Sequence, residues 1–312
     1  SRAKHRDGIG NQHDVVGRYF MDHPQSYLNI LKPTNRKIFD DAKLYDLRPN
    51  GNYGIMGKLT FNEDTLRKEQ LMNGCYVLFP RRDHFMSEAF QSFFTMLLTV
   101  VHAQRPSQIG YHVKTMAKGW NHLAQIGLWQ LQGKAPYPYL ARGGWSDIPN
   151  PSSLFDVFEV FSLLEQAPDP TNRVTLIDDV DPNGTQKVNV HWKFTDMDRD
   201  TVARSRKLFE GELQAANMGS MVWHPDPYTS ASSVHPIGTT RMGTDPQTSV
   251  TDGNCMVRGV NNLYIASSGV FATSGYANPT LTVVALACRI ADRVKASLKR
   301  VPEVKPVAAA AN

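Results

Sequence analysis

The chain is poor in cysteine, and its three cysteines, Cys75, Cys255 and Cys288, lie far apart. An odd number of widely spaced cysteines does not indicate a disulfide framework. Since no Cys-x-x-Cys pair provides the ligand spacing of a zinc site, we also expect no metal centre. Long apolar runs are also missing. The most apolar stretch, residues 85–102, contains a glutamate and a glutamine and falls short of the ~20 apolar residues that cross a bilayer. We therefore expect no transmembrane segment.

An export leader is not visible, because residues 1–7 are polar and charged. The localisation stays open, and we expect the cytoplasm only if sequence upstream of Ser1 carries no export signal. Lysine and arginine number 34 against 29 acidic residues, a net charge of +5. Since no basic arm stands out, this charge indicates a solvated surface rather than a nucleic-acid site.

A glycine fingerprint for dinucleotide binding is the most informative absence. Such a fingerprint, Gly-x-Gly-x-x-Gly, follows a strand and opens a helix. The nearest glycine pairs lie in residues 8–10 and 51–57 and have neither the spacing nor the strand-turn-helix setting. The chain therefore contains no predicted clamp for a dinucleotide pyrophosphate. With 312 residues and 41% apolar composition, it is still long enough for two domains.

Two short segments carry chemistry of their own: residues 234–243, Val-His-Pro-Ile-Gly-Thr-Thr-Arg-Met-Gly, and residues 275–282, Gly-Tyr-Ala-Asn-Pro-Thr-Leu-Thr. The first offers His235, whose imidazole titrates near neutral pH and can accept the proton of an alcohol. The second offers Asn278, whose uncharged amide can donate to the developing alkoxide. Neither side chain can accept a hydride, so oxidation of an alcohol would need a cofactor.

These segments, with Asn-Asn-Leu-Tyr-Ile-Ala at 261–266, resemble the C-terminal part of the glucose-methanol-choline (GMC) flavoprotein oxidoreductases. Residues 232–296 carry nearly all of the resemblance. Residues 10–24 resemble the segment that follows the flavin-binding half, especially in the branch that oxidises sugars and gluconate. The resemblance implies that His235 is the family's catalytic histidine and Asn278 its His/Asn partner.

The resemblance also implies an FAD site. Where the family usually has an acidic residue after the tyrosine-bearing strand, this chain has Ser267, although small residues still let backbone amides approach a flavin. A helix that starts near Pro279 would direct its positive end toward the flavin. The residues expected to contact FAD are Ser267, Ser268, Gly269, Asn278, Pro279 and Thr280.

Other polar residues have weaker assignments. Glu165 and Gln166 are expected to face the substrate, because the cap sheet of the family covers the reactive side of the flavin, although a solvated loop explains them almost as well. Asn278 has a competing interpretation as a helix N-cap before a proline. Of the ten histidines, only His235 lies in the motif, whereas His23 and His224 precede prolines and are expected to shape turns.

The predicted fold is an α+β substrate domain with an antiparallel sheet and helices. It is followed by the C-terminal portion of an α/β FAD-binding domain whose N-terminal half is missing from this chain. We expect a linker at 1–20, the substrate-binding domain at 21–219, the catalytic part of the FAD-binding domain at 220–300 and a disordered tail at 301–312.

Several elements can be placed by periodicity and turn residues. Helices are expected at about 85–103 and 111–131, and a hairpin joins 173–177 to 188–192 around Asp-Pro-Asn-Gly. Thr195 or Asp196 is expected to cap a further helix that runs to Met218, with Gly219 as its terminator. Large apolar residues at helical spacing in the first helix predict a core-facing side. They are Phe90, Phe93, Phe94, Leu97, Leu98 and Val101.

The predicted function is oxidation of a CH–OH group of a sugar or glycoside to the ketone or lactone, with the proton passing to His235 and the hydride to flavin N5. The expected partners are the missing FAD-binding half, in the same polypeptide or a separate chain, a small alcohol or sugar, and oxygen, a quinone or a cytochrome as electron acceptor. Two alternatives stay open: a hydroxynitrile lyase of the same scaffold, and a non-catalytic flavoprotein subunit. A serine hydrolase is disfavoured, since no Gly-x-Ser-x-Gly elbow is present.

Overall fold

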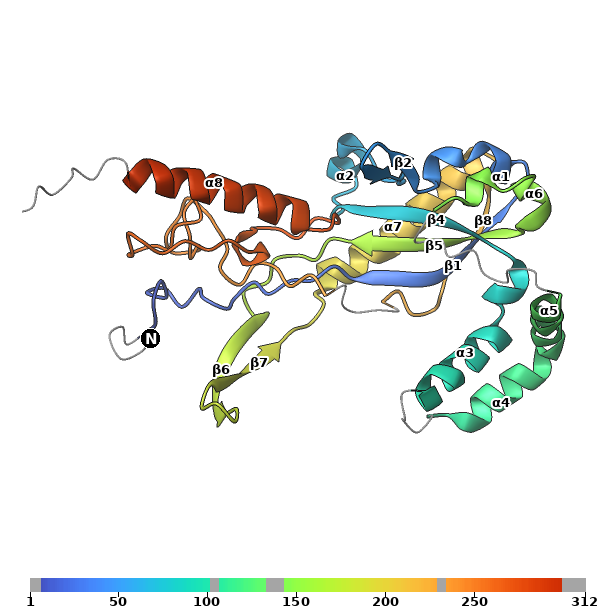
Figure 1. Ribbon diagram of the computed structural model, residues 1–312, viewed down its shortest axis with the longest axis horizontal. Coiled ribbons are helices and arrows are strands. Elements are labelled where there is room, and N and C mark those ends of the chain that lie inside the picture. Colours follow the sequence, from blue (N-terminus) through green and yellow to red (C-terminus); the bar gives the residue numbers. More distant parts are fainter. Residues whose placement is uncertain (1–6, 102–106, 133–142, 229–233, 299–312) are drawn as a thin grey trace, which may run out of the picture. The chain divides into compact units, whose positions relative to one another are not determined.

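The computed structural model describes residues 7–101, 107–132, 143–228 and 234–298. The chain divides into two compact units, which we describe separately (Figure 1). Unit 1 comprises Ser1–His23, Glu165–Asp198 and Ser232–Asn312, and unit 2 comprises Pro24–Leu164 and Arg199–Ala231. Within the described residues, no helix is both long and apolar enough to cross a bilayer.

Unit 2 is built on a four-stranded antiparallel sheet in the order β4-β5-β1-β8, which confirms the predicted antiparallel sheet with helices. The adjacent strands β4 and β5 are almost wholly buried, as expected where a sheet is covered on both faces. The strands of the sheet are β1 (Gln25–Pro33), β4 (Gly74–Arg81), β5 (Val157–Leu164) and β8 (Gly219–Val222).

The core of unit 2 forms between this sheet and the long helix α7 (Asp196–Ala215). Tyr76 of β4 stacks on Phe209 of α7 with ring centroids 3.9 Å apart. The smaller elements of the unit are α1 (Ile38–Asp41), η1 (Lys43–Tyr45), β2 (Arg48–Asn50), β3 (Tyr53–Ile55), α2 (Glu63–Lys68), η2 (Asp83–Met86), η4 (Trp145–Asp147) and α6 (Pro151–Leu154).

The start of α7 is as predicted, and its end is not. Thr195 accepts the Asp198 amide at 3.2 Å and the Asp198 carboxylate accepts the Thr195 amide at 2.6 Å, a reciprocal cap. The helix ends at Ala215, and Asn217 takes the left-handed conformation with φ of 52°. Gly219 instead opens β8, where a Cβ atom would lie 2.2 Å from the Lys32 carbonyl oxygen.

Three further helices of unit 2 gather as one cluster in Figure 1: α3 (Glu88–Val101), α4 (Ile109–Lys118) and α5 (Trp120–Leu131). The predicted helix at 111–131 is thus broken at Gly119. A Cβ atom there would lie 2.5 Å from that of Ala89, so the corner packs closely on α3. The predicted core-facing side of α3 is wrong: Phe93, Phe94, Leu97, Leu98 and Val101 are 41–67% exposed.

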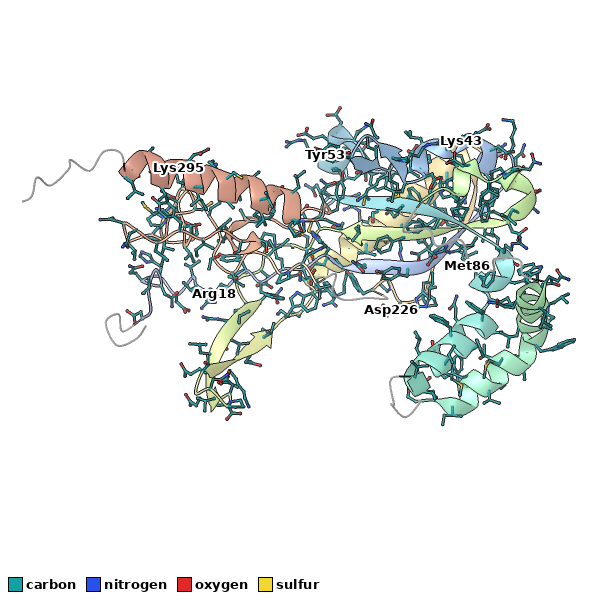
Figure 2. The ribbon with its side chains drawn as sticks, viewed as in Figure 1. Arg18, Lys43, Tyr53, Met86, Asp226 and Lys295 are labelled. Atoms are coloured by element: carbon teal, nitrogen blue, oxygen red, sulfur yellow. The ribbon has the colours of Figure 1, made fainter. Side chains whose placement is uncertain are left out.

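Unit 1 contains the predicted hairpin, formed by β6 (Arg173–Val180) and β7 (Gln186–His191), together with η5 (Ser268–Val270) and α8 (Thr280–Leu298). Residues 17–23, which we call the N-terminal strap, run between the hairpin and the segment after His235. The Gly17 carbonyl accepts the Val174 amide at 2.8 Å, and the Gly17 amide donates to the Thr239 carbonyl at 2.8 Å. Arg18, labelled in Figure 2, donates to the Pro170 carbonyl at 3.1 Å.

The division into units differs from the predicted boundaries at 20/21 and 219/220. Residues 165–198 belong with the C-terminal segments, whereas β8 and the residues after it up to 231 belong with the sheet of unit 2. The physical reason is pairing: β8 pairs with β1, and the strap bonds to both β6 and the His235 segment. The predicted disordered tail at 301–312 lies outside the described residues.

Candidate active site

The loop that carries His235 is held by backbone pairing with the strap. Met21 and Ile237 are both fully buried, and each donates its amide to the other's carbonyl, at 3.0 and 2.9 Å. Gly238 has φ of 93°, and a Cβ atom there would lie 2.2 Å from the Tyr19 carbonyl oxygen. Glycine is therefore required for the strap to approach so closely.

The segment around η5 holds the same loop from its other side. The Ser268 hydroxyl donates to the Pro236 carbonyl at 2.7 Å, and the Thr240 amide donates to the Gly269 carbonyl at 2.9 Å. Before the loop, Val234 has φ of 58°, a strained value for a β-branched residue. His235 itself is half-buried, so its backbone is held by the fold while part of the residue is open to a ligand.

Asp22 of the strap connects two histidines. It is 3% exposed, and its Oδ1 accepts the backbone amides of His23 at 2.7 Å and of His235 at 3.2 Å. Sequence reasoning missed this residue. Its only sequence signal is its place in Met-Asp-His-Pro, within the strap segment that resembles the family.

His23 is the second residue that the sequence analysis missed, having been assigned to a turn. It is fully buried, its Nδ1 lies 2.9 Å from the Gly275 carbonyl oxygen, and its ring lies 5.3 Å from that of His235 at 76°. Because a carbonyl only accepts, Nδ1 carries the proton. Burial, and then the neighbouring His235, lower the pKa of His23 below its usual range. A neutral imidazole of fixed orientation therefore lies against the ring of His235.

The segment before Asn278 is fixed by three groups of unit 1. Gly275 donates its amide to the Glu165 carboxylate at 3.2 Å and gives its carbonyl to His23, while the Gln166 amide donates to the Ser274 hydroxyl at 3.0 Å. His23 thus contacts both predicted catalytic loops.

Asn278 follows this fixed segment and is exposed. Among the described residues its side chain makes no hydrogen bond. The first helical bond of α8 runs from the Val283 amide to the Pro279 carbonyl at 3.0 Å, so Pro279 occupies the cap position and Asn278 precedes it. The N-cap interpretation of Asn278 is therefore wrong, and its amide remains available to a ligand.

Gln166 does not fit the predicted substrate contact. Its side chain is fully buried; the amide oxygen accepts from the Asp22 amide at 3.1 Å and the Trp192 indole at 2.9 Å, and the amide nitrogen donates to the Lys193 carbonyl at 3.0 Å. These bonds join the strap to the segment after the hairpin. Gln166 is thus a positioning residue. Glu165, half-buried, holds Gly275 through its carboxylate.

The predicted cofactor residues cluster at two places that suit a phosphate or a flavin edge. At Gly269, a Cβ atom would lie 2.6 Å from the Thr240 hydroxyl oxygen, and this oxygen is buried without a hydrogen-bond partner among the described residues. At α8, the amides of Thr280, Leu281 and Thr282 precede the first helical bond and have no acceptor within the helix. These residues could hold an anionic cofactor.

Comparisons with known proteins relate part of this chain to one family. Residues 168–287 match the C-terminal domain of the family described as GMC oxidoreductase. The chain is 33% identical over 143 residues to the fructose dehydrogenase large subunit of Gluconobacter japonicus, covering 46% of this chain and 26% of that protein. It is 32% identical over 145 residues to the paromamine 6'-oxidase of Streptomyces fradiae, covering 46% and 27%.

A solved formate oxidase variant from Aspergillus oryzae is 18% identical, covering 92% of this chain and 48% of that one with a TM-score of 0.40. That score is too low for an argument about fold. The matched part of the chain spans about a quarter of the two sequence relatives. Residues 168–287 of this chain thus correspond to the C-terminal domain of the GMC oxidoreductases.

Proposed function

We propose that the complete protein is an FAD-dependent oxidoreductase that oxidises a CH–OH group of a sugar or glycoside. The observation that carries the proposal is the link through His23, which lies against His235 and holds the carbonyl of Gly275, three residues before Asn278. A proton acceptor and an uncharged donor are thereby fixed to one buried group. The family and the fructose and paromamine relatives support a hydroxyl of a sugar as the substrate.

In this proposal His235 takes the hydroxyl proton of the substrate on a ring nitrogen. Asn278 donates an amide N–H to the same oxygen as negative charge develops on it. His23 stays neutral and keeps both loops in place, so that the proton moves to His235 rather than to its neighbour. The carbinol carbon becomes a carbonyl when its hydrogen leaves as a hydride.

FAD, when bound, supplies the acceptor for that hydride. The residues that would hold it are the Ser267–Ser268–Gly269 segment and the first amides of α8 at Thr280, together with Asn278 and Pro279. Within the described residues, the Thr240 hydroxyl has no hydrogen-bond partner and the first amides of α8 have no acceptor in the helix, which supports this assignment. Helix amides of this kind can bind an anion, but neither place has the glycine clamp of a pyrophosphate site.

We infer that the pyrophosphate clamp is supplied by an N-terminal FAD-binding half that these residues do not include. The exposure of α8 supports this inference, because Leu281 is 82% and Val284 54% exposed. The expected result is that residues 1–312 alone lose FAD on desalting, whereas the complete protein keeps it. Stoichiometric flavin absorbance in the isolated chain would overturn this part.

The function is tested by anaerobic mixing of the complete protein with fructose, paromamine or a simple primary alcohol. We expect a sugar to bleach the flavin absorbance, which only an oxidoreductase can do. Cyanide release from a cyanohydrin without bleaching would identify the lyase. If no tested donor bleaches the flavin and no cyanide is released, the result would favour a non-catalytic subunit.

A further inference from the structure

The helix cluster α3–α5 exposes many large apolar side chains. Their exposed fractions range from 41% at Leu98 to 88% at Leu131. A concentration of exposed apolar side chains on neighbouring helices is typical of an interaction site in a folded protein. The exposed residues are Phe93, Phe94, Leu97, Leu98, Val100 and Val101 in α3, Ile109, Tyr111 and Val113 in α4, and Trp120, Leu128 and Leu131 in α5.

A groove adds to this apolar surface. It has a volume of about 820 Å³ and lies between α3 and α5, where Phe90, Phe94 and Leu97 face Leu123 and Ile126. Almost all of its lining is apolar, and Glu159 is the acidic residue that reaches it. Glu159 is already paired with Arg81 at 2.8 Å, so the groove presents no free negative charge.

The same part of the sequence carries charge of one sign. Residues 89–146 contain five lysines or arginines and no aspartate or glutamate. This segment accounts for the whole net charge of +5, and the rest of the chain is balanced. Lys114 and Lys118 are exposed on α4, beside the apolar Tyr111 and Val113. Neither lysine forms an ion pair with the described residues.

The nearest acidic residues along the chain, Asp83 and Glu88, come before this segment or at its start. They line a shallow pocket together with Lys114 and Lys118, at the base of α3. The exposed end of α3 at Val100 and Val101 has no acidic residue near it in sequence. Along the sequence, residues 89–146 therefore place only basic charges among the apolar side chains, and the two acidic residues precede them.

We propose that the α3–α5 cluster docks on a bilayer that contains anionic phospholipid. Exposed apolar and aromatic side chains on three neighbouring helices, with exposed lysines on α4, match the physics of an interfacial surface: the apolar groups enter the headgroup boundary and the lysines meet lipid phosphates. The attachment that we propose is of α3–α5 to one face of the bilayer.

A second copy of the chain fits this surface less well. Self-association would place the positive surfaces of two copies against each other, and like charges brought together across an interface oppose binding. An acidic protein partner would satisfy the charge, and the experiment separates it from lipid because only purified components are used. The proposal is independent of the catalytic assignment, since no residue of unit 1 takes part.

The test is sedimentation of the complete purified protein with vesicles of phosphatidylcholine alone or of phosphatidylcholine with phosphatidylserine. We expect binding to the second kind, weakened by salt. The double variant Lys114→Glu/Lys118→Glu should bind about tenfold more weakly or worse, since each basic residue near an anionic surface contributes substantially. The variant Leu97→Glu should also lose binding.

Matched controls are Lys43→Glu, at a lysine of unit 2 labelled in Figure 2, and Val188→Glu, at an exposed apolar position of β7. Both should bind like the wild type, and thermal unfolding should show all variants folded. Failure of the wild type to bind either vesicle would overturn the proposal, as would equal losses in the controls. A concentration-dependent dimer that Leu97→Glu abolishes, without vesicle binding, would assign the surface to a second copy instead.

Discussion

The buried imidazole of His23 lies edge to face against that of His235, with ring centroids 5.3 Å apart and an interplanar angle of 76°. The same ring donates from Nδ1 to the Gly275 carbonyl at 2.9 Å. One side chain from the N-terminal strap therefore touches the proton acceptor and fixes the segment that leads to Asn278. Asp22, next to it, accepts the amides of both histidines.

His235→Ala in the complete protein should slow reduction of the flavin by a sugar about 10²- to 10⁴-fold, as loss of a general base does. FAD should stay bound, because the proposed cofactor contacts lie elsewhere in the chain. Anaerobic stopped-flow absorbance at several pH values measures the effect. A rate within a few-fold of the wild type would place the base on another residue.

Asn278→Ala should lower the reduction rate by about 10²- to 10³-fold, the usual cost of one donor to a developing oxyanion. Asn278→His should restore part of the rate, because an imidazole N–H can donate from a similar position. Thermal unfolding of Asn278→Ala should match the wild type, since the cap position of α8 is Pro279 and the Asn278 side chain makes no capping bond. A destabilised variant with a normal reduction rate would show a structural role instead.

His23→Phe should reduce the loss of stability at acidic pH. The pKa of His23 is lowered by burial from 6.5, so below that pH the unfolded chain binds a proton that the folded chain does not. Wild-type stability therefore falls with pH from about 6.5 until the pH passes the lower folded-state pKa. Urea unfolding at a series of pH values measures this slope, with the exposed His191→Phe as control. If the free energy of unfolding depended on pH in the same way in His23→Phe and in the wild type, this prediction would be contradicted.

The positioning role of His23 predicts a kinetic order among its variants. His23→Asn keeps an N–H near the Gly275 carbonyl and should retain more of the reduction rate than His23→Phe. The pH profile of reduction should shift in both variants, since the neighbour of His235 has changed. If the two variants reduced the flavin at equal rates and the pH profile did not shift, His23 would have only a packing role.

Gln166→Leu should lower the free energy of unfolding by about 2–6 kcal/mol, because leaving the Asp22 amide and the Trp192 indole without their acceptor costs about 1–3 kcal/mol each. The Lys193 carbonyl keeps the Asn172 amide as a donor at 2.9 Å. Denaturant unfolding measures it, and the exposed Gln247→Leu should change stability little. The KM for sugar in the surviving enzyme should not rise, as Gln166 has no exposed surface. A raised KM with normal stability would return Gln166 to the substrate site.

The sequence by itself determined the features that depend on local chemistry. Turn residues at Asp181 and Gly184 define the β6–β7 hairpin, and the reciprocal cap of Thr195 and Asp198 starts α7. The motif around His235 could be found without a structure, because its proline and glycines limit the backbone wherever they occur.

Only the tertiary structure decided which distant residues meet. His23 and Gly275 are separated by 252 positions, and no periodicity or spacing predicts that contact. Gln166 could not be distinguished from a substrate ligand until its buried partners were known. The apolar stripe of α3 was visible in the sequence, but helical spacing shows only that one face is apolar. Whether that face is covered depends on which segments pack against it, and here Leu97 and Val101 remain open to solvent.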